Sequence, residues 1–316
     1  MLSSIAALTV ASVAAWVLTP VIRVAARRRG LLDEPTERKV HGVAIPRLGG
    51  VAIAVAFYLG IAAGLVVETL AGGQRSPTDQ IVVVLLGAAL VACIGLLDDL
   101  VGMRARVKLA AQIGVALVVV LLGLSIDHLD GPWGSFPLGP WALPLTVAWF
   151  VVVMNAMNLI DGLDGLASGV ALIAMAVFYL VATSGGLATP IALVLAAAAG
   201  GVIGFLPYNL YPATIIMGDT GAILLGFLLA AAGVAVTQSG SPGAAVWVPV
   251  AALGLALADT GWAVVRRIAS GAPILAPDKR HVHHRLLAAG LSQRTTMVVL
   301  WLVSAALGLI AVFTAR

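Results

Sequence analysis

Charged residues are scarce in this sequence. Only 10% of its 316 residues are Asp, Glu, Lys or Arg, whereas soluble domains carry about 25%. Hydrophobic residues make up 61% of the chain, and the mean hydropathy is +1.09. An ordinary soluble domain is therefore excluded, and with a net charge of only +4 no nucleic-acid partner is expected. The composition predicts an all-α polytopic membrane protein in contact with membrane lipid.

Cysteine and several catalytic signatures are also missing. The single cysteine, Cys93, lies inside an apolar run, so an intramolecular disulfide is excluded. The sequence contains no P-loop, no Gly-x-Gly-x-x-Gly after a strand and no Ser/His/Asp set. It shows neither an internal repeat nor a low-complexity tail. One integral-membrane domain covering residues 1–316 is expected.

Long apolar runs dominate the chain instead. A helix needs about 20 apolar residues to cross the hydrocarbon core of a bilayer. Ten transmembrane helices are predicted, near residues 3–22, 48–67, 81–97, 107–124, 142–158, 165–183, 188–206, 217–236, 245–265 and 296–314. The first run could be a signal peptide, but no positive charge precedes it and Arg23, Arg27 and Arg28 follow it, which favours a retained helix.

Basic residues indicate the orientation of these helices. Loops on the cytoplasmic side of a membrane carry an excess of Lys and Arg. With the N-terminus outside, sixteen of the eighteen Lys and Arg residues fall on the inside, and only Arg75 and Arg316 fall outside. The same orientation places four polar clusters on the inner face, so the active site is expected on the cytoplasmic face of the cell membrane.

The first cluster interrupts the hydrophobic pattern between the fifth and sixth spans. Asn158, Asp161 and Asp164 lie there, with glycines at 162 and 165. Polar side chains at the junction of membrane helices are costly unless they bind something, and glycine lets the backbone approach a ligand closely. A polar turn between two helices is the structural alternative. The repeated Asp-Gly pair, with an asparagine three residues upstream, favours a binding site.

Further acidic residues end or begin membrane spans. Asp98 and Asp99 end the third span, and Asp219 opens the eighth. Mg²⁺ prefers a few carboxylates together with phosphate oxygens and water, so these three residues are candidate metal ligands. Adjacent acids seldom point at one centre, so Asp98 and Asp99 could divide the roles of ligand and base. The structural alternatives are a solvated helix end for the pair and an N-cap for Asp219.

Basic side chains gather in the loop before the last span. This loop holds Arg280, His281, His283 and His284. The histidines lack the i, i+4 spacing of a zinc-binding helix, and the neighbouring cations suit a phosphate. A phosphate or diphosphate is the expected ligand, and one histidine could transfer a proton. A zinc site is the alternative.

Several other ionisable residues give weaker signals. Lys39 and Arg47, between the first two spans, are either ordinary positive-inside charge or phosphate contacts. Lys108, near the inner end of the fourth span, is expected to be a charge partner of the acidic pair in the third. Asp259 lies within the ninth span, with Arg266 seven residues further on the same helix face. A structural hydrogen bond or ion pair is expected for Asp259, although an acid inside the membrane is also a functional candidate.

The sequence predicts phosphoryl transfer to or from a lipid. It combines acidic residues that suit Mg²⁺ with basic residues that suit phosphate, and both occur in a membrane protein. In such reactions positioning and charge neutralisation carry most of the catalysis. The alternative of a different class is a transporter of anionic or lipid-linked cargo. Transporters usually have internal repeats and polar sites at the membrane midplane, whereas these clusters share one face.

The ordered motifs resemble those of the polyprenyl-phosphate N-acetylhexosamine-1-phosphate transferases, over nearly the whole chain. The matching segments are residues 38–41, 46–50, 97–99, 108–109 with Gln112, 158–167, Asn209 with 212–213, 217–221 and 278–286. Val282 interrupts the run of histidines, and this pattern is similar to that of the WecA- or TagO-like branch, which uses UDP-N-acetylglucosamine. The branch that uses the UDP-N-acetylmuramoyl-pentapeptide is the runner-up. Gly102 departs from the family pattern, because a third charged residue often stands there.

The resemblance implies an enzyme of ten or eleven spans that requires Mg²⁺, with Mn²⁺ as an alternative metal. It would transfer a sugar 1-phosphate from a UDP-sugar to a polyprenyl phosphate, release UMP and start a cell-envelope glycan, and a homodimer is also implied. Asp219 would bind the metal, Asp98 or Asp99 would bind it or deprotonate the lipid phosphate, and the histidine loop would hold the diphosphate or sugar. Asn158, Asp161 and Asn209 would line the uridine side. The full set of expected substrate-binding residues is Lys39, Arg47, Lys108, Asn158, Asp161, Asp164, Asn209 and Arg280.

Overall fold

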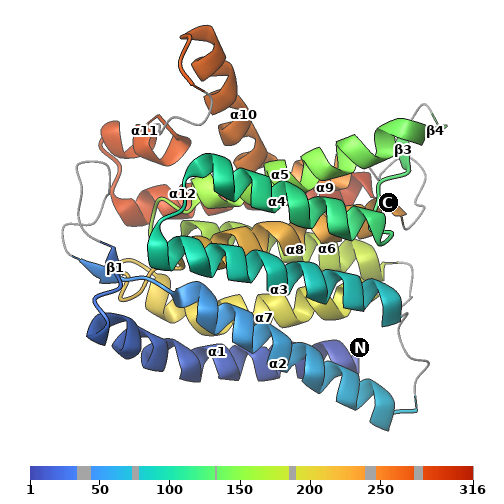
Figure 1. The fold of residues 1–316 in the computed structure, drawn as a ribbon, viewed down its shortest axis with the longest axis horizontal. Coiled ribbons are helices and arrows are strands. Elements are labelled where there is room, and N and C mark those ends of the chain that lie inside the picture. The colour runs from blue at the N-terminus through green and yellow to red at the C-terminus, as the bar shows by residue number, and fades with distance from the viewer. Residues whose placement is uncertain are drawn as a thin grey trace.

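The chain forms a bundle of long helices (Figure 1). A computed structural model describes residues 1–33, 44–72, 78–131, 134–184, 190–238, 247–273 and 280–315. Its helices are α1 Leu2–Arg28, α2 Gly49–Leu70, α3 Thr78–Val101, α4 Ala105–Leu121, α5 Ala142–Ile160, α6 Leu166–Thr183, α7 Pro190–Asn209, α8 Gly218–Gln238, α9 Trp247–Ala252, α10 Gly254–Ala269, α11 Val282–Ala288 and α12 Gln293–Thr314. Two antiparallel strand pairs join β1 Leu32–Asp33 to β2 Ile45–Pro46 and β3 His128–Gly131 to β4 Gly134–Pro137.

The helices confirm an all-α polytopic membrane protein. Among the described residues, eight helices are long and apolar enough to cross a membrane. Each of the ten predicted runs contains helix, but α4 has only 17 residues. The prediction of one continuous ninth span is wrong: Leu253, with φ −100° and ψ 9°, divides it into α9 and α10. Figure 1 shows α10 running at a steep angle to the rest of the bundle. The total number of spans and their orientation stay predictions.

Helix α8 forms the centre of the bundle. It is apolar all round and nearly every residue from Thr220 to Thr237 is buried, as expected for a helix enclosed by others. Neighbours α2, α3, α5 and α6 pack around it. The approach of α5 requires a glycine, since a Cβ on Gly226 would lie 2.6 Å from the Cα of Met154. A helix held on so many sides gives a fixed base to the side chains at its start.

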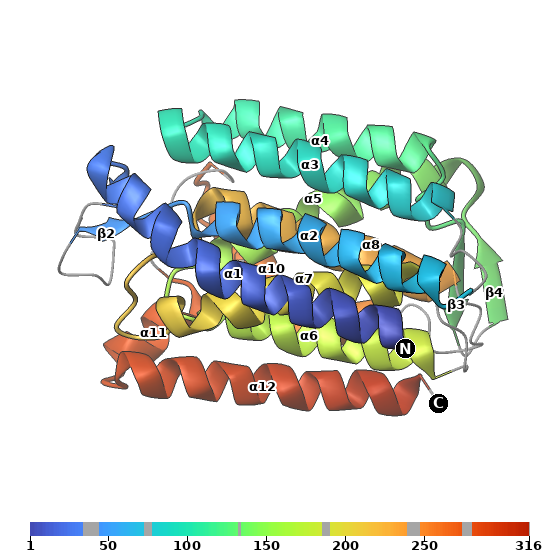
Figure 2. The same ribbon diagram turned by 90° about the horizontal axis from the view of Figure 1, so that it is seen from below.

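The predicted polar clusters lie at one end of the bundle. The end of α3, the start of α4, the junction of α5 with α6 and the start of α8 meet there, as the two views together show (Figures 1 and 2). The marked chain ends and the β3–β4 hairpin lie at the opposite end. The expected gathering of the motifs on one face is therefore confirmed, and we call this the site end of the bundle.

Candidate active site

A polar cavity of about 350 Å³ opens at the site end. Nine of the predicted site residues line it, from five separate segments of the chain. They are Arg47, Asp98, Asp99, Asn158, Asp161, Asp164, Asn209, Asp219 and His284. Folding thus brings together residues that lie up to 237 positions apart in the sequence.

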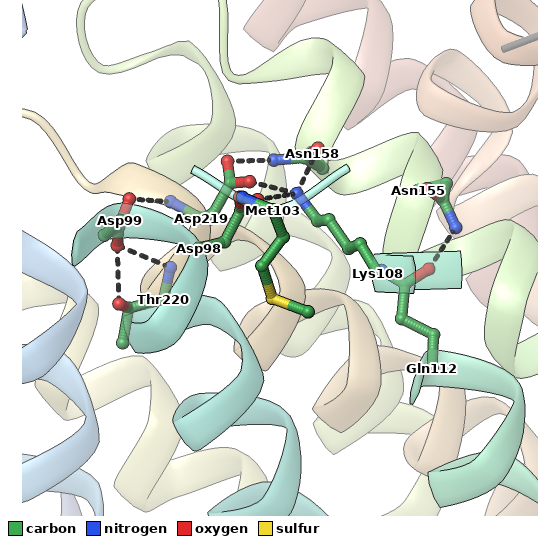
Figure 3. A network of polar contacts seen from close by, with 9 residues as sticks. All are labelled: Asp98, Asp99, Met103, Lys108, Gln112, Asn155, Asn158, Asp219 and Thr220. Carbon is green, nitrogen blue, oxygen red and sulfur yellow. Dashed lines mark hydrogen bonds and ion pairs between the residues drawn. The ribbon is translucent and has the colours of Figure 1, made fainter. Parts of the chain in front are cut away.

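Lys108 joins two acidic residues of this cavity, Asp98 and Asp219, into one network with Asn158 (Figure 3). Its Nζ lies 2.9 Å from Oδ2 of Asp98, contacts Oδ2 of Asp219 and donates to Oδ1 of Asn158 at 3.3 Å. The Asn158 amide in turn donates to Oδ1 of Asp219 at 2.8 Å. The backbone N–H of Met103 donates to Oδ1 of Asp98 at 2.6 Å. The predicted pairing of Lys108 with the acidic pair of the third span is confirmed for Asp98.

The two adjacent aspartates have different partners. Asp99 is only 5% exposed, and its Oδ1 accepts the N–H of Asp219 at 2.9 Å. Its Oδ2 accepts both the N–H and the hydroxyl of Thr220, at 2.9 and 2.6 Å. These bonds satisfy free N–H groups in the first turn of α8. Asp99 therefore caps this helix, a role that the sequence analysis had considered for Asp219. The carboxylate of Asp219 is left to face Lys108 and Asn158.

Close backbone packing places Arg47 at the cavity. The next residue, Leu48, has φ +93° and is the one non-glycine residue of the described chain with positive φ. The N–H of Gly50 then donates to the carbonyl of Met217 at 2.7 Å. A Cβ on Gly50 would overlap the backbone nitrogen of Gly221, so only glycine fits there. Nε of Arg47 is buried and has no hydrogen-bond partner among the described residues, which suits an anionic ligand.

Two polar residues of the cavity wall also hold the loop before α8. Oδ2 of Asp164 accepts the backbone N–H of Ala213 at 2.9 Å, and Asp164 is only 3% exposed. Asn209 accepts a hydrogen bond from the Ser168 hydroxyl at 2.8 Å and donates to the carbonyl of Ile215 at 3.3 Å. Both side chains therefore have a structural part in addition to any contact with substrate.

Asp161 directly follows α5 and lies in a negatively charged environment. Burial, followed by the negative charges of Asp219 and Asp99, raises the pKa of Asp161 to about 8. Asp33 adds to this field and also lines the cavity, although the sequence analysis did not select it. An isolated acid next to a short apolar pair gives no motif. The position of Asp33 became clear only from the β1–β2 pairing, which sets it opposite Ile45, and from the cavity that it lines together with Arg47. Gly102, the departure from the family pattern, lines the cavity as well.

The expectation of a loop is wrong for the histidines: His281 is the N-cap of helix α11 and His283 and His284 lie in its first turn, and one ring of this histidine loop reaches the cavity. His284 lines the cavity, whereas His281 and His283 are 3% and 1% exposed and lie behind it. The expected structural partner of Asp259 is His281, and its carboxylate also accepts the backbone N–H of Val282 at the start of α11. Arg280 is exposed and does not line the cavity, and Lys39 falls outside the residues that the structure describes.

The donor chemistry of the cavity suits Mg²⁺. Six carboxylates line it, from Asp33, Asp98, Asp99, Asp161, Asp164 and Asp219, and hard oxygen donors are what Mg²⁺ prefers. Zn²⁺ fits less well, since His284 is the single histidine or cysteine among the described residues that line the cavity. No three acidic or histidine side chains of the described residues already form a ligand cluster. The ammonium of Lys108 lies between Asp98 and Asp219 and compensates their negative charges. A metal ion bound there would compensate the same two carboxylates.

Fold and cavity together define a multi-pass membrane protein with a polar, enzyme-like site at one end of its helix bundle. The family model described as glycosyl transferase family 4 matches residues 81–237. A Bacillus subtilis (strain 168) protein named "Probable undecaprenyl-phosphate N-acetylglucosaminyl 1-phosphate transferase" is 38% identical over 305 residues, covering 96% of this chain and 82% of its own. The chain belongs to glycosyl transferase family 4.

Other relatives in the same family extend this comparison. The decaprenyl-phosphate N-acetylglucosaminephosphotransferase of Mycolicibacterium smegmatis is 37% identical, over 92% of this chain and 77% of its own. The undecaprenyl-phosphate alpha-N-acetylglucosaminyl 1-phosphate transferase of Escherichia coli K12 is 28% identical, over 92% and 78% of the two chains. The resemblance found in the sequence is confirmed, and the chain is a multi-pass protein of the bacterial membrane.

Proposed function

We propose that this enzyme transfers N-acetylglucosamine 1-phosphate from UDP-N-acetylglucosamine to a polyprenyl phosphate. The products would be polyprenyl-diphosphate-N-acetylglucosamine and UMP, the first membrane step of a cell-envelope glycan. The observation that carries the proposal is the network of Asp98, Lys108, Asn158 and Asp219 in a cavity that Arg47 also lines. The names of the three relatives support the same reaction.

Asp219 and Asp98 are the residues that would hold Mg²⁺. Both carboxylates face the same point of the cavity, and Asn158 fixes one oxygen of Asp219. When bound, Mg²⁺ would neutralise charge on the diphosphate of the nucleotide sugar. Asp99 fits this role poorly because the first turn of α8 already occupies both of its oxygens.

We infer a direct displacement at phosphorus. An oxygen of the lipid phosphate would form a bond to the β-phosphorus, the bond from that phosphorus to the bridging oxygen would break, and UMP would leave with that oxygen. The rival route forms an aspartyl intermediate on Asp98. Against it, the Asp98 carboxylate accepts hydrogen bonds from Lys108 and Met103, which reduce its nucleophilicity. Lys108 and Arg47 would hold the phosphoryl oxygens in place.

The proposal places the cavity on the cytoplasmic face, where nucleotide sugars are found. That assignment rests on the Lys and Arg distribution and is tested by labelling single cysteines, placed in the inner and outer loops of a Cys93→Ser background, with a membrane-impermeant maleimide. The expected homodimer is a separate prediction, decided by the mass of the detergent-solubilised protein.

Release of UMP by the purified protein tests the reaction and the choice of nucleotide. Polyprenyl phosphate is supplied with UDP-N-acetylglucosamine or with the UDP-N-acetylmuramoyl-pentapeptide, each with Mg²⁺, with Mn²⁺ and with a chelator. Lipid-dependent and metal-dependent release from UDP-N-acetylglucosamine alone is expected. Release from the pentapeptide nucleotide alone would move the chain to the other branch. No release from either by folded protein would favour another nucleotide sugar or a transporter.

A further inference from the structure

Asp259 of α10 holds the histidine loop from outside the cavity. Its Oδ2 pairs with Nδ1 of His281 at 2.8 Å, and its Oδ1 accepts the backbone N–H of Val282 at 2.8 Å. The pair is buried, with 7% of the Asp259 side chain and 4% of the His281 side chain exposed. An ionised carboxylate only accepts hydrogen bonds, so the ring of His281 must carry a proton on Nδ1. One carboxylate therefore sets both the protonation of His281 and the start of α11.

The three histidine rings connect this carboxylate to the cavity. The rings of His281 and His283 are parallel within 6°, with centroids 6.0 Å apart. The rings of His283 and His284 have centroids 4.3 Å apart, and His284 lines the cavity. A change in the orientation of His281 is thus transmitted through two ring contacts to a side chain of the site.

Packing holds the middle of this stack. A Cβ on Gly162 would lie 2.5 Å from Nε2 of His283, so the ring sits directly against the polar stretch beside Asp161. Both ring nitrogens of His283, and Nε2 of His281, have no hydrogen-bond partner among the described residues. Burial and the neighbouring histidines lower the pKa of His283 to about 4, so this ring is neutral at pH 7. The bond to Asp259 is the polar anchor that fixes the position of His281.

We propose that Asp259 is a positioning residue of the transferase reaction and acts through His281. It fixes the Nδ1-protonated form of that ring and, through the stack, the place of His284 at the cavity. Carboxylates commonly set the tautomer and orientation of an imidazole in this way. The inference rests on the proposed function, because turnover is one of its two readouts.

The variant Asp259→Asn separates the two tasks of the carboxylate. Its amide oxygen can still accept the Val282 N–H, but its amide nitrogen is a donor and would force the His281 proton to Nε2. We expect a thermal midpoint within a few degrees of the wild-type value and a loss of roughly 10- to 100-fold in kcat/KM, the usual size for a lost partner of a functional side chain. Thr260→Val is the matched control on the same helix, because the Thr260 hydroxyl has no partner among the described residues.

Spectra of [¹⁵N]histidine-labelled protein give a readout that packing alone would not change. The wild-type protein should contain a ring protonated on Nδ1 whose signal is absent in His281→Gln. In Asp259→Asn that ring should carry its proton on Nε2, and in Thr260→Val it should be as in the wild type. If Asp259→Asn does not fold, the comparison of wild type with His281→Gln still tests the inference. The absence of an Nδ1-protonated His281 in the wild-type spectrum would overturn it.

A double variant tests whether Asp259 acts through His281. In a His281→Gln background, Asp259→Asn is expected to cause no further loss of kcat/KM, because two residues that act as one unit are not additive. Wild-type kcat/KM in Asp259→Asn would overturn the inference, as would a loss that multiplies the loss of His281→Gln. A wild-type protein that releases no UMP would instead overturn the proposed function, while the spectra would still test the tautomer.

Discussion

Thr220 donates two hydrogen bonds to a single carboxylate oxygen of Asp99, from its N–H at 2.9 Å and from its hydroxyl at 2.6 Å. This pairing fixes the start of α8 to the end of α3. The glycine one turn before Asp99 allows the approach, since a Cβ on Gly95 would lie 2.5 Å from the Cα of Thr220. As a result Asp219, the residue before Thr220, keeps a fixed position at the cavity. The adjacent acids Asp98 and Asp99 thus have separate tasks. Asp99 supports the start of α8, and Asp98 faces Lys108.

The two aspartates of α3 should respond differently to neutralisation. In Asp99→Asn an amide nitrogen would face a buried N–H group, so we expect a loss of about 2 kcal/mol of stability and a Tm lower by several degrees. Asp98→Asn should keep a near wild-type Tm, because Asp98 caps no helix, and lose turnover by orders of magnitude. Thermal unfolding and UMP release, measured on both variants, test this. Equal Tm losses in the two would contradict the division of roles.

Removing the charge of Lys108 should abolish most of the activity. We expect Lys108→Met to lower turnover by about a hundredfold, the usual effect of one lost donor to a reacting anion. Half-maximal thermal stabilisation should also need less Mg²⁺, because the ammonium no longer compensates Asp98 and Asp219. Arg106→Met, an exposed change on the same helix, is the control and should leave both quantities unchanged. A Lys108→Met protein with wild-type turnover would remove Lys108 from the site.

The raised pKa of Asp161 predicts a pH-dependent stability. Its pKa is about 8 in the folded protein and about 4 in an unfolded chain, so the folded state binds the extra proton between these values. The resulting stabilisation is complete below about pH 4 and disappears as the pH rises through 8. Without Mg²⁺, the wild-type Tm should therefore fall from pH 5 to pH 9 more steeply than that of Asp161→Asn. The exposed change Asp79→Asn should keep the wild-type slope. Parallel slopes for wild type and Asp161→Asn would refute the prediction.

A side chain at position 162 should lower the activity while the protein still folds. A methyl group there would lie 2.5 Å from Nε2 of His283 and displace this buried ring, which packs against His284 at the cavity. We expect Gly162→Ala to fold and to lose turnover by at least tenfold, because small displacements of positioning groups have effects of this size or larger. Gly261→Ala is the control, since a Cβ on Gly261 meets no atom within 4 Å. Equal activity of the two variants would contradict the packing of His283 against Gly162.

Much of the fold follows from two simple patterns in the sequence. Apolar runs near the thickness of a bilayer predicted where helices occur, and the polar residues that interrupt them marked the site end. The break at Leu253 was missed because the residues around it, 245–258, carry no polar side chain, so hydropathy alone gives no sign of it. Pro249 and Gly254 beside it are the cues that a closer reading of local propensity would have used.

The partners of individual carboxylates could not be predicted from the sequence. Whether Asp98 or Asp99 caps α8 depends on how α3 is rotated against α8, and close packing at Gly95 decides this rotation. The partners of Asp259 could not be predicted either. Helical spacing pointed to Arg266, but the described hydrogen bonds of the Asp259 carboxylate are to His281 and Val282, which lie 22 and 23 residues further along the chain. Local spacing predicts neighbours on one helix and gives no information about contacts between helices.

The fate of the β-phosphate tests the central claim most directly. UDP-N-acetylglucosamine labelled with ³²P at the β-position is incubated with polyprenyl phosphate, Mg²⁺ and purified protein, and the lipid and nucleotide products are separated. Transfer of the sugar 1-phosphate predicts that all of the transferred label appears in the lipid product and that the released nucleotide is unlabelled UMP. Label released as UDP, with the sugar alone on the lipid, would show attack at the sugar carbon and contradict the account.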